Sequence, residues 1–265
     1  MVILRRVIRF CVNPGGEDGG GVNGYGGKPA MRGLGRHYEL EVVCRGAPDH
    51  ETGYLLNIKE IDAAAREAVL PTIVEACRNA PETEPATMMA VLATRVQRAL
   101  APTEVRGLLW RLTPTYSVEI SIDEESPTMA SVLMRQRFDF AAAHRLHLAS
   151  FSDEENRRLF GRCNNPNGHG HNYQVEPCVE LPEGGAFTLE DLEQLTHEHV
   201  LEAYDHTNLN EDTSDFAVGV GVNPSVENIS RACFERLAPA IEERGARLRH
   251  VTVWETDRTS ARYPG

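Results

Sequence analysis

The two halves of the chain contain similar sequence segments in the same order. Residues 168–176 match residues 33–41 at one fixed offset, with two glycines, a tyrosine and a glutamate in common. Three further pairs of segments match in the same order: residues 184–192 with 53–61, residues 236–239 with 99–102, and Arg137-Phe138 with Arg9-Phe10. A repeat of this length indicates two copies of one folding unit. Each half therefore reads as two strands, two helices and a final pair of strands.

The length and charge of the chain limit its class. With 265 residues it is long enough for two modules of about 130 residues, each with its own core. We place the first module at residues 1–124 and the second at residues 128–265, joined by the short acidic stretch 123–127. The formal charge of -12 argues against a nucleic-acid partner, because nonspecific nucleic-acid binding needs a basic surface.

The sequence predicts neither a membrane span nor an oxidising compartment. No apolar run approaches the roughly 20 residues that cross a bilayer, and Arg5 and Arg6 interrupt the N-terminal segment where a signal peptide would be apolar. The six cysteines contain no CxxC pair and no dense framework, which suits a reducing cytosol. We therefore expect a soluble cytoplasmic protein without a membrane partner.

Hydrophobic periodicity and capping residues locate the secondary structure. Helices are predicted at residues 62–77, from about Thr87, at residues 189–204, and from Ser225 to about residue 243. Pro71 predicts a kink or a break in the first of these helices. Strands are predicted near residues 3–12, 37–45, 115–122, 131–140, 172–179 and 249–255. The glycine-rich stretch 15–27 predicts a loop rather than a phosphate-binding turn, because no Lys-Ser/Thr helix start follows it.

A thiol and two imidazoles lie close together in the second half. Cys163, His169 and His171 fall in a segment that reads as a turn followed by a strand. Side chains two residues apart on a strand point to the same face, so His169 and His171 would aim at one point. With His144 upstream they give three nitrogens and an open fourth position, which is the layout of a catalytic zinc site. The alternative is a pair of strand-edge histidines and a loop thiol, since an isolated His-x-His is a weak signal.

The segments around these residues closely resemble the 6-pyruvoyltetrahydropterin synthase family, which includes the bacterial 6-carboxytetrahydropterin synthases. The resemblance begins in residues 140–173 and continues, in the order of the family, through residues 205–210 (DHTNLN), 223–228 (NPSVEN) and 254–256 (WET). These matches are spread over about half of the chain. Ser225-Val226 departs from the threonine-containing form of this motif.

The resemblance implies an α+β protein with the tunnelling fold. In that fold each module contributes an antiparallel four-stranded sheet with two helices packed outside, and neighbouring modules complete a barrel. This chain resembles a tandem version of the fold. We therefore expect a homo-oligomer, in which three chains would supply six modules in two stacked rings, because one module cannot close a barrel and remove its open edges.

The resemblance also assigns roles to individual residues. His144, His169 and His171 would hold Zn2+, and Cys163 would be the general base. Asp205 and His206 resemble the proton-relay pair of the family, in which a carboxylate orients an imidazole.

The remaining assignments concern the substrate. Glu255 resembles the carboxylate that anchors the pterin ring, whose edge offers two adjacent N–H donors. Glu227 is expected to support this site or to begin its helix. Four arginines are candidates for contacts with a triphosphate: Arg145, Arg157, Arg158 and Arg162. His147, His197 and His199 are expected to be surface or substrate-side groups rather than metal ligands.

The first half lacks the metal-binding and substrate-binding residues at the aligned positions. His169 corresponds to Leu34, His171 to Arg36, and Glu255 falls near Thr113. Leucine cannot bind a metal, so we expect residues 1–124 to be a degenerate module that serves as a scaffold.

The predicted activity is that of a lyase that acts on 7,8-dihydroneopterin triphosphate with loss of triphosphate. Because the composition resembles that of a bacterial protein, we expect the 6-carboxy product of queuosine-type deazapurine synthesis. One alternative is the 6-pyruvoyl product of tetrahydrobiopterin synthesis, which the spacing from Cys163 to His169 resembles. Another is a noncatalytic tunnelling-fold protein that binds a pterin or purine, and the intact triad of the second half argues against it.

Overall fold

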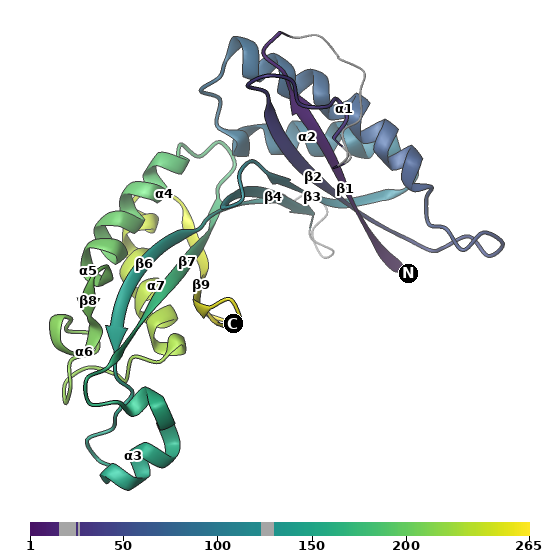
Figure 1. The fold of residues 1–265 in the computed structure, drawn as a ribbon. Coiled ribbons are helices and arrows are strands. Elements are labelled where there is room, and N and C mark those ends of the chain that lie inside the picture. The colour runs from purple at the N-terminus through teal and green to yellow at the C-terminus, as the bar shows by residue number, and fades with distance from the viewer. Residues whose placement is uncertain (16–24, 26, 123–129) are drawn as a thin grey trace. The chain divides into compact units, whose positions relative to one another are not determined.

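The computed structural model describes residues 1–15, 25, 27–122 and 130–265. These residues form two compact units, Met1–Met134 and Arg135–Gly265, each with strands and helices (Figure 1). The division falls inside strand β5 (Ala130–Gln136), later in the chain than the expected linker. That linker and most of the glycine-rich stretch lie outside the described residues.

The first unit contains an antiparallel sheet and two helices. Its strands, each paired with the next, are β1 (Val2–Val12), β2 (Arg36–Gly46), β3 (Glu104–Arg111) and β4 (Tyr116–Ile122). Helices α1 (Ile58–Asn79) and α2 (Pro85–Leu100) pack against this sheet. Of the kink or break predicted at Pro71, the break does not occur, because α1 continues through it. Val69 and Ile73, on either side of Pro71, are fully buried, and such packing compensates for the hydrogen bond that proline removes.

The second unit is also built mainly on antiparallel strands. Its strands follow one another in the order β6 (Phe138–His144), β7 (His169–Leu181), β9 (Arg247–Thr256) and β10 (Thr259–Tyr263). The short β8 (Thr207–Asn208) lies parallel to β6. Helix α7 (Val226–Glu243) packs against β9 and β10 (Figure 1). It begins where predicted, since the Ser225 side chain accepts a hydrogen bond from the Asn228 N–H.

The helix predicted over residues 189–204 consists of three consecutive pieces. They are α4 (Leu189–Thr196), the π-helical turn η2 (His197–Leu201) and α5 (Glu202–Tyr204). A π-helical turn inside a helix frequently marks a functional site. Here it comes just before Asp205, the first residue of the expected relay pair.

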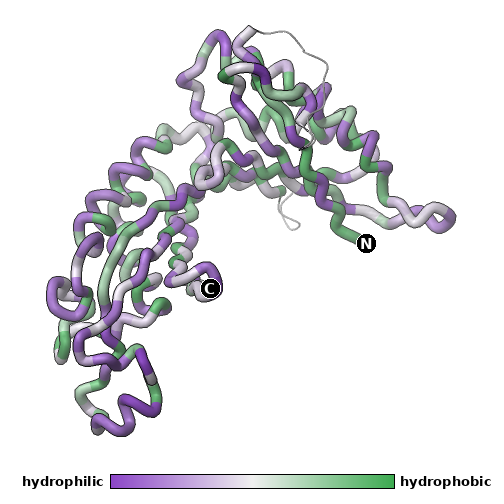
Figure 2. Tube along the Cα trace, in the orientation of Figure 1, coloured by the Kyte–Doolittle hydropathy of each residue, from purple (hydrophilic) through white to green (hydrophobic). Residues whose placement is uncertain are grey.

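The predicted strand over residues 131–140 is also divided, into β5 and β6. Three short helices in the second unit were not predicted: α3 (Asp153–Phe160), the 3-10 turn η1 (Gly161–Asn164) and α6 (Leu209–Asp212). A signal for α3 was present, because Ser152 and Glu155 form a reciprocal capping box. Most residues of α3 are hydrophilic (Figure 2), so hydrophobic periodicity did not indicate a helix there.

The strand registers correct one part of the sequence repeat. Phe10 is the cross-strand partner of Tyr38, and Phe140 is the partner of Tyr173. Because Tyr38 and Tyr173 occupy the same place in the repeat, Phe10 corresponds to Phe140, and the match of Arg9-Phe10 with Arg137-Phe138 is wrong by two residues. Both aromatic pairs are in contact, with ring centroids 5.8 Å and 5.0 Å apart.

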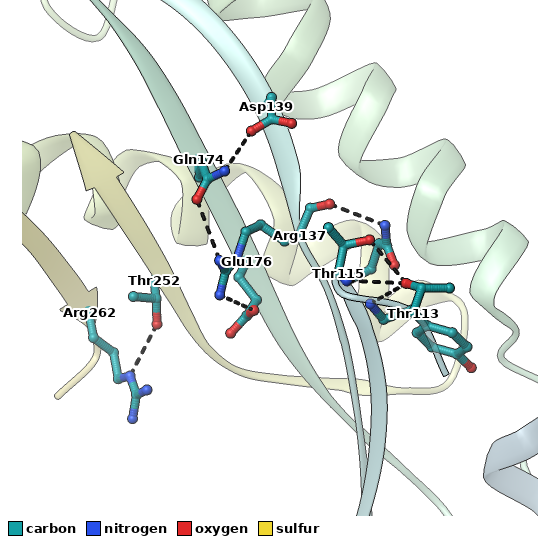
Figure 3. A network of polar contacts seen from close by, with 10 residues as sticks. Thr113, Thr115, Arg137, Asp139, Gln174, Glu176, Thr252 and Arg262 are labelled. Carbon is teal, nitrogen blue, oxygen red and sulfur yellow. Dashed lines mark hydrogen bonds and ion pairs between the residues drawn. The ribbon is translucent and has the colours of Figure 1, made fainter. Parts of the chain in front are cut away.

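One face of the sheet in the second unit is polar. The Arg137 guanidinium lies 3.5 Å from Gln174 Oε1 and 3.3 Å from Glu176 Oε2, and Gln174 donates a hydrogen bond to Asp139 (Figure 3). The same guanidinium lies over the Trp254 ring, 4.3 Å from its centroid. These side chains alternate along β6 and β7 with the buried Phe140 and Tyr173, so they lie on the face away from the core.

The described residues agree with an α+β protein, in which antiparallel strands and helices pack within each unit. None of the helices in this part of the chain combines the length and the apolar composition that a membrane crossing requires.

Candidate functional site

Three imidazoles meet at adjoining ends of β6 and β7. His144 and His169 are cross-strand partners, and His171 lies opposite Ala142 in the same ladder. The Nε2 atoms of His144 and His169 are 3.1 Å apart, and nitrogen atoms of all three histidines lie within 4.8 Å of one another. The structure therefore brings the three expected ligands together. No second cluster of this kind occurs among residues 1–15, 25, 27–122 and 130–265.

The surroundings of the triad favour the neutral forms of His144 and His169. His144 has no solvent-exposed surface, and burial lowers its pKa to about 4. Burial, assisted by the neighbouring His171, also lowers the pKa of His169. The Pro224 carbonyl oxygen lies 2.7 Å from His144 Nδ1. Because a carbonyl can only accept, the proton belongs on Nδ1, and the lone pair of Nε2 faces the other two rings.

The unsatisfied atoms of the triad fit a metal ion. His169 Nδ1 and His171 Nε2 are buried and make no hydrogen bond, and such atoms are rare because their desolvation is not compensated. Glu255 Oε1 lies 3.5 Å from His144 Nε2 and 3.6 Å from His171 Nε2. Three imidazoles beside a carboxylate form a donor set that suits a divalent cation such as zinc.

A glycine is required where the turn enters β7. Gly168 has a φ of 69°, and a Cβ atom at this position would lie 3.1 Å from the backbone oxygen of His144. A side chain there would meet both an unfavourable backbone conformation and a close contact. Gly168 therefore allows the chain to turn so that His169 can face His144.

A cleft of about 550 Å³ opens beside β6, β7 and β8. Its lining includes His171 from the triad and His206 from the expected relay pair. Asp205 Oδ2 lies 2.9 Å from His206 Nδ1, and Asp205 Oδ1 accepts a hydrogen bond from the Ala141 N–H. These bonds, that of Ala141 first, lower the pKa of Asp205 and keep it ionised. The His206 side chain is 83% exposed, so its second nitrogen is accessible from the cleft.

Cys163 is partly buried in η1 and does not line this cleft. Its backbone oxygen accepts a hydrogen bond from Leu146, which ties η1 to the loop that follows β6. Glu227 is exposed in the first turn of α7. Arg157, Arg158 and Arg162 are exposed, whereas Arg145 is partly buried and donates to the Asn164 carbonyl.

The loop after β6 depends on asparagines that sequence reasoning missed. Their side chains bond to its backbone at four points: Asn210 to Arg145, Asn164 to Leu146, Asn223 to His147 and Asn156 to Leu148. Asparagine can accept and donate at once, so it can replace the missing strand partners of a loop. The available signal was the number of asparagines in residues 164–167, 205–210 and 223–228.

The other histidines of this region lie outside the triad. His147 follows the end of β6, and its Nδ1 lies 3.0 Å from the Asn164 side chain. It was expected to be a surface or substrate-side group, and it lies half-buried in the loop after β6. His197 is exposed and lies 3.4 Å from Glu202. In the first unit, Leu34 is exposed, and Arg36 lies 3.9 Å from Cys77 Sγ.

Comparison with known proteins gives consistent matches to one family. The model of the family described as 6-pyruvoyl tetrahydropterin synthase matches residues 133–265. The 6-pyruvoyl tetrahydrobiopterin synthase of Homo sapiens is 38% identical over 134 residues, which cover 49% of this chain and 89% of that protein. A putative 6-pyruvoyl tetrahydrobiopterin synthase of Caenorhabditis elegans is 37% identical over 143 residues, with 52% and 97% covered. The solved structure of the Caenorhabditis elegans 6-pyruvoyl tetrahydropterin synthase is 35% identical, covers 52% of this chain and 97% of its own, and has a TM-score of 0.47.

Proposed function

The chain belongs to the 6-pyruvoyl tetrahydropterin synthase family, and from this membership we propose that its second unit is a zinc-dependent lyase that releases triphosphate from 7,8-dihydroneopterin triphosphate. One observation carries the proposal. His171 of the triad and His206 of the acid–imidazole pair line the same cleft. A molecule bound in this cleft would reach the metal site through His171 and the proton-transfer pair through His206, so both could act on it.

The triad would supply the metal site. His144, His169 and His171 would hold zinc through three imidazoles, the ligand number of many catalytic zinc sites. Bound there, zinc would act as a Lewis acid toward the side-chain hydroxyls of the substrate and make the adjacent C–H more acidic. The Pro224 carbonyl supports this role by fixing the His144 tautomer that leaves Nε2 free.

Proton transfer would fall to Cys163 and to the Asp205–His206 pair. Cys163 would be the general base that removes the side-chain proton. Asp205 holds Nδ1 of His206 at 2.9 Å, which leaves Nε2 of His206 free to exchange a proton with a molecule in the cleft. The bond from Ala141 to Asp205 ties this pair to the same strand that carries His144.

Glu255 and Glu227 would serve the substrate. We keep Glu255 as the carboxylate that anchors the pterin ring, as expected from the sequence, and its Oε1 lies 3.5 Å from His144 Nε2 and 3.6 Å from His171 Nε2. The anchored ring would therefore lie close to the metal. Glu227, which is exposed in the first turn of α7, would support this site or begin its helix.

We propose the 6-pyruvoyl compound as the product. The relatives described above carry that activity in their names, and the six-residue separation of Cys163 and His169 resembles the pyruvoyl type. The 6-carboxy product, which the bacterial character of the composition led us to expect, requires an additional cleavage of the side chain. It is the alternative outcome of the experiment described below.

We also propose that the first unit is a scaffold and that the chain forms a homo-oligomer. Leu34 and Arg36 stand where His169 and His171 stand in the second unit, so the described residues of the first unit hold no such triad. Each unit contributes four antiparallel strands whose edges need partners. Three chains would supply six such units and allow closed barrels.

The test is to incubate the zinc-loaded protein with 7,8-dihydroneopterin triphosphate and to identify the products by mass spectrometry. We expect release of triphosphate and a 6-pyruvoyl product. His171→Ala should abolish turnover, whereas His197→Ala, which changes an exposed histidine outside the triad, should leave it intact. A 6-carboxy product would change only the product assignment. Recovery of unchanged substrate from a protein that binds it would refute the enzyme and favour a noncatalytic pterin-binding role.

A further inference from the structure

The turn that carries Asp205 and His206 has an unfavourable backbone. His206 has a φ of 59° and is the only non-glycine residue in the described part of the chain with a positive φ. This conformation is unfavourable for a residue with a side chain, so it persists only where its surroundings enforce it. Strand β6 helps to hold His206 in this conformation, because the His206 N–H donates a hydrogen bond to the Ala141 carbonyl at 2.6 Å.

A second group of residues supports the turn from its other side. Tyr204 directly precedes Asp205, and its side chain is fully buried. Its hydroxyl donates to Asp215 Oδ2 at 2.7 Å and accepts a hydrogen bond from Arg236 Nε at 3.0 Å. Arg236 also donates to Asp215 Oδ2 from Nε at 2.8 Å and from Nη2 at 2.6 Å. We call these three residues the Tyr204 cluster.

The Tyr204 cluster joins three segments at one point. Tyr204 ends α5, Asp215 lies in the loop after α6, and Arg236 belongs to α7. Burial raises the pKa of Tyr204, so its hydroxyl stays protonated and remains a donor. Arg236 and Asp215 are 32% and 29% exposed, and charge-assisted bonds of this kind are short and directional.

The position of Tyr204 determines the position of the turn that follows it. The Tyr204 carbonyl accepts a hydrogen bond from Thr207 Oγ1 at 2.8 Å, so the residues before and after Asp205-His206 are linked to each other. The Tyr204 ring also contacts Phe216, with centroids 5.6 Å apart. A shift of Tyr204 would therefore move Asp205 and His206 with respect to the cleft.

We propose that Tyr204, Asp215 and Arg236 are positioning residues that hold His206 in the orientation used for proton transfer. This inference rests on the proposed function of the same cleft. The Tyr204 ring also lies 6.2 Å from the Phe140 ring, and Tyr204→Phe retains this contact. The polar groups of the cluster bond neither to the triad nor to the residues that line the cleft, except through the turn itself. These polar groups therefore act on proton transfer and leave metal binding unchanged. Small errors in the placement of a reacting group lower a rate by as much as about a hundredfold.

The variants that test this inference are Tyr204→Phe and Arg236→Gln, with Arg231→Gln as the matched control. Tyr204→Phe keeps the ring and the Arg236–Asp215 ion pair and removes only the hydroxyl. Arg231 lies on the same helix and pairs with Glu235 at 2.7 Å, but both side chains are more than half exposed. We expect the first two variants to lower kcat by about tenfold to a hundredfold with little change in KM or in zinc content. Arg231→Gln should leave all three values unchanged.

A double-mutant cycle separates positioning from a general loss of stability. If Arg236 acts through His206, then Arg236→Gln should have no further effect on kcat in a His206→Ala background. Equal fold-losses of kcat in both backgrounds would refute the proposal, as would a loss of zinc together with activity in Tyr204→Phe.

A measurement without turnover distinguishes failure of this inference from failure of the proposed function. The ring 15N–1H correlations of His206 report its hydrogen bond to Asp205 in the resting protein. They should shift or broaden in Tyr204→Phe and stay unchanged in Arg231→Gln. If the unsubstituted protein shows no turnover, the proposed function fails, and this spectrum alone decides the positioning role. An unchanged His206 signal in both Tyr204→Phe and Arg236→Gln would refute it.

Discussion

Replacing Phe140 by leucine should weaken both the second unit and its metal site. Phe140 is almost fully buried and stacks on Tyr173, with ring centroids 5.0 Å apart and planes inclined by 13°. Loss of such a ring pair costs roughly 0.5–1.5 kcal/mol beyond burial, and the change of side-chain shape costs up to about 1.5 kcal/mol more. The free energy of unfolding of this unit should therefore fall by about 1–3 kcal/mol.

The effect on the metal site passes through Tyr173. The Tyr173 hydroxyl lies 3.3 Å from His144 Nδ1, so the stacked pair supports the ring that faces the other two imidazoles. Loss of groups that orient a metal ligand typically costs about tenfold to a hundredfold in affinity. We expect a zinc affinity near the lower end of that range for Phe140→Leu, because the Pro224 carbonyl still holds His144.

Phe10→Leu is the matched control, because Phe10 stands in the corresponding pair with Tyr38 in the first unit. The two tryptophans of the chain, Trp110 in β3 and Trp254 in β9, allow each unit to be followed separately by fluorescence in urea. Phe10→Leu should destabilise the first unit by a similar amount and leave zinc affinity, measured by competition with a chelator, unchanged. Equal losses of zinc affinity in the two variants would show that the aromatic pair does not act on the triad.

Three further outcomes follow from the site. The purified protein should hold about one zinc per chain. His169→Ala should lose this zinc and His147→Ala should keep it. Elemental analysis that found two tightly bound zinc ions per chain would contradict a single triad. Cys163→Ala should retain zinc and pterin binding but lose about a hundredfold to ten-thousandfold in turnover, as for a general base; loss of zinc would identify Cys163 as a ligand. Light scattering at micromolar concentration should give the mass of three chains, and a monomeric mass would count against assembly through sheet edges.

The elements that the sequence predicted well are those with a strong local pattern. Residues 3–12 and 172–179 alternate or run apolar and are strands, and Ser225 begins a helix as its capping chemistry predicts. The convergence of His169 and His171 followed from their spacing on a strand. His144 could be placed beside them only through the resemblance to a family, because its partner in the ladder is 25 residues away.

The features that could not be predicted depend on tertiary contacts. The division of residues 131–140 into two strands has no clear local signal, and neither does the positive φ of His206. Glu255 was assigned to the pterin ring from the sequence motif, and only the ladder of β7 with β9 shows that it faces the triad. The Tyr204 cluster joins residues 11 and 21 positions apart in the chain, beyond the reach of helical or strand periodicity.

The two units differ chemically at one end of an otherwise similar strand pair. Phe10 with Tyr38 and Phe140 with Tyr173 fix the same register, and counting onward from them places Pro14 where His144 stands. Strand β1 ends at Val12, before that position, whereas β6 continues to His144. Asn13 accepts a hydrogen bond from the Arg32 N–H and donates to the Ala30 carbonyl, so the chain leaves the ladder here. Histidines at positions 34 and 36 alone would therefore not recreate a triad, because the strand that should present the third ligand has already ended.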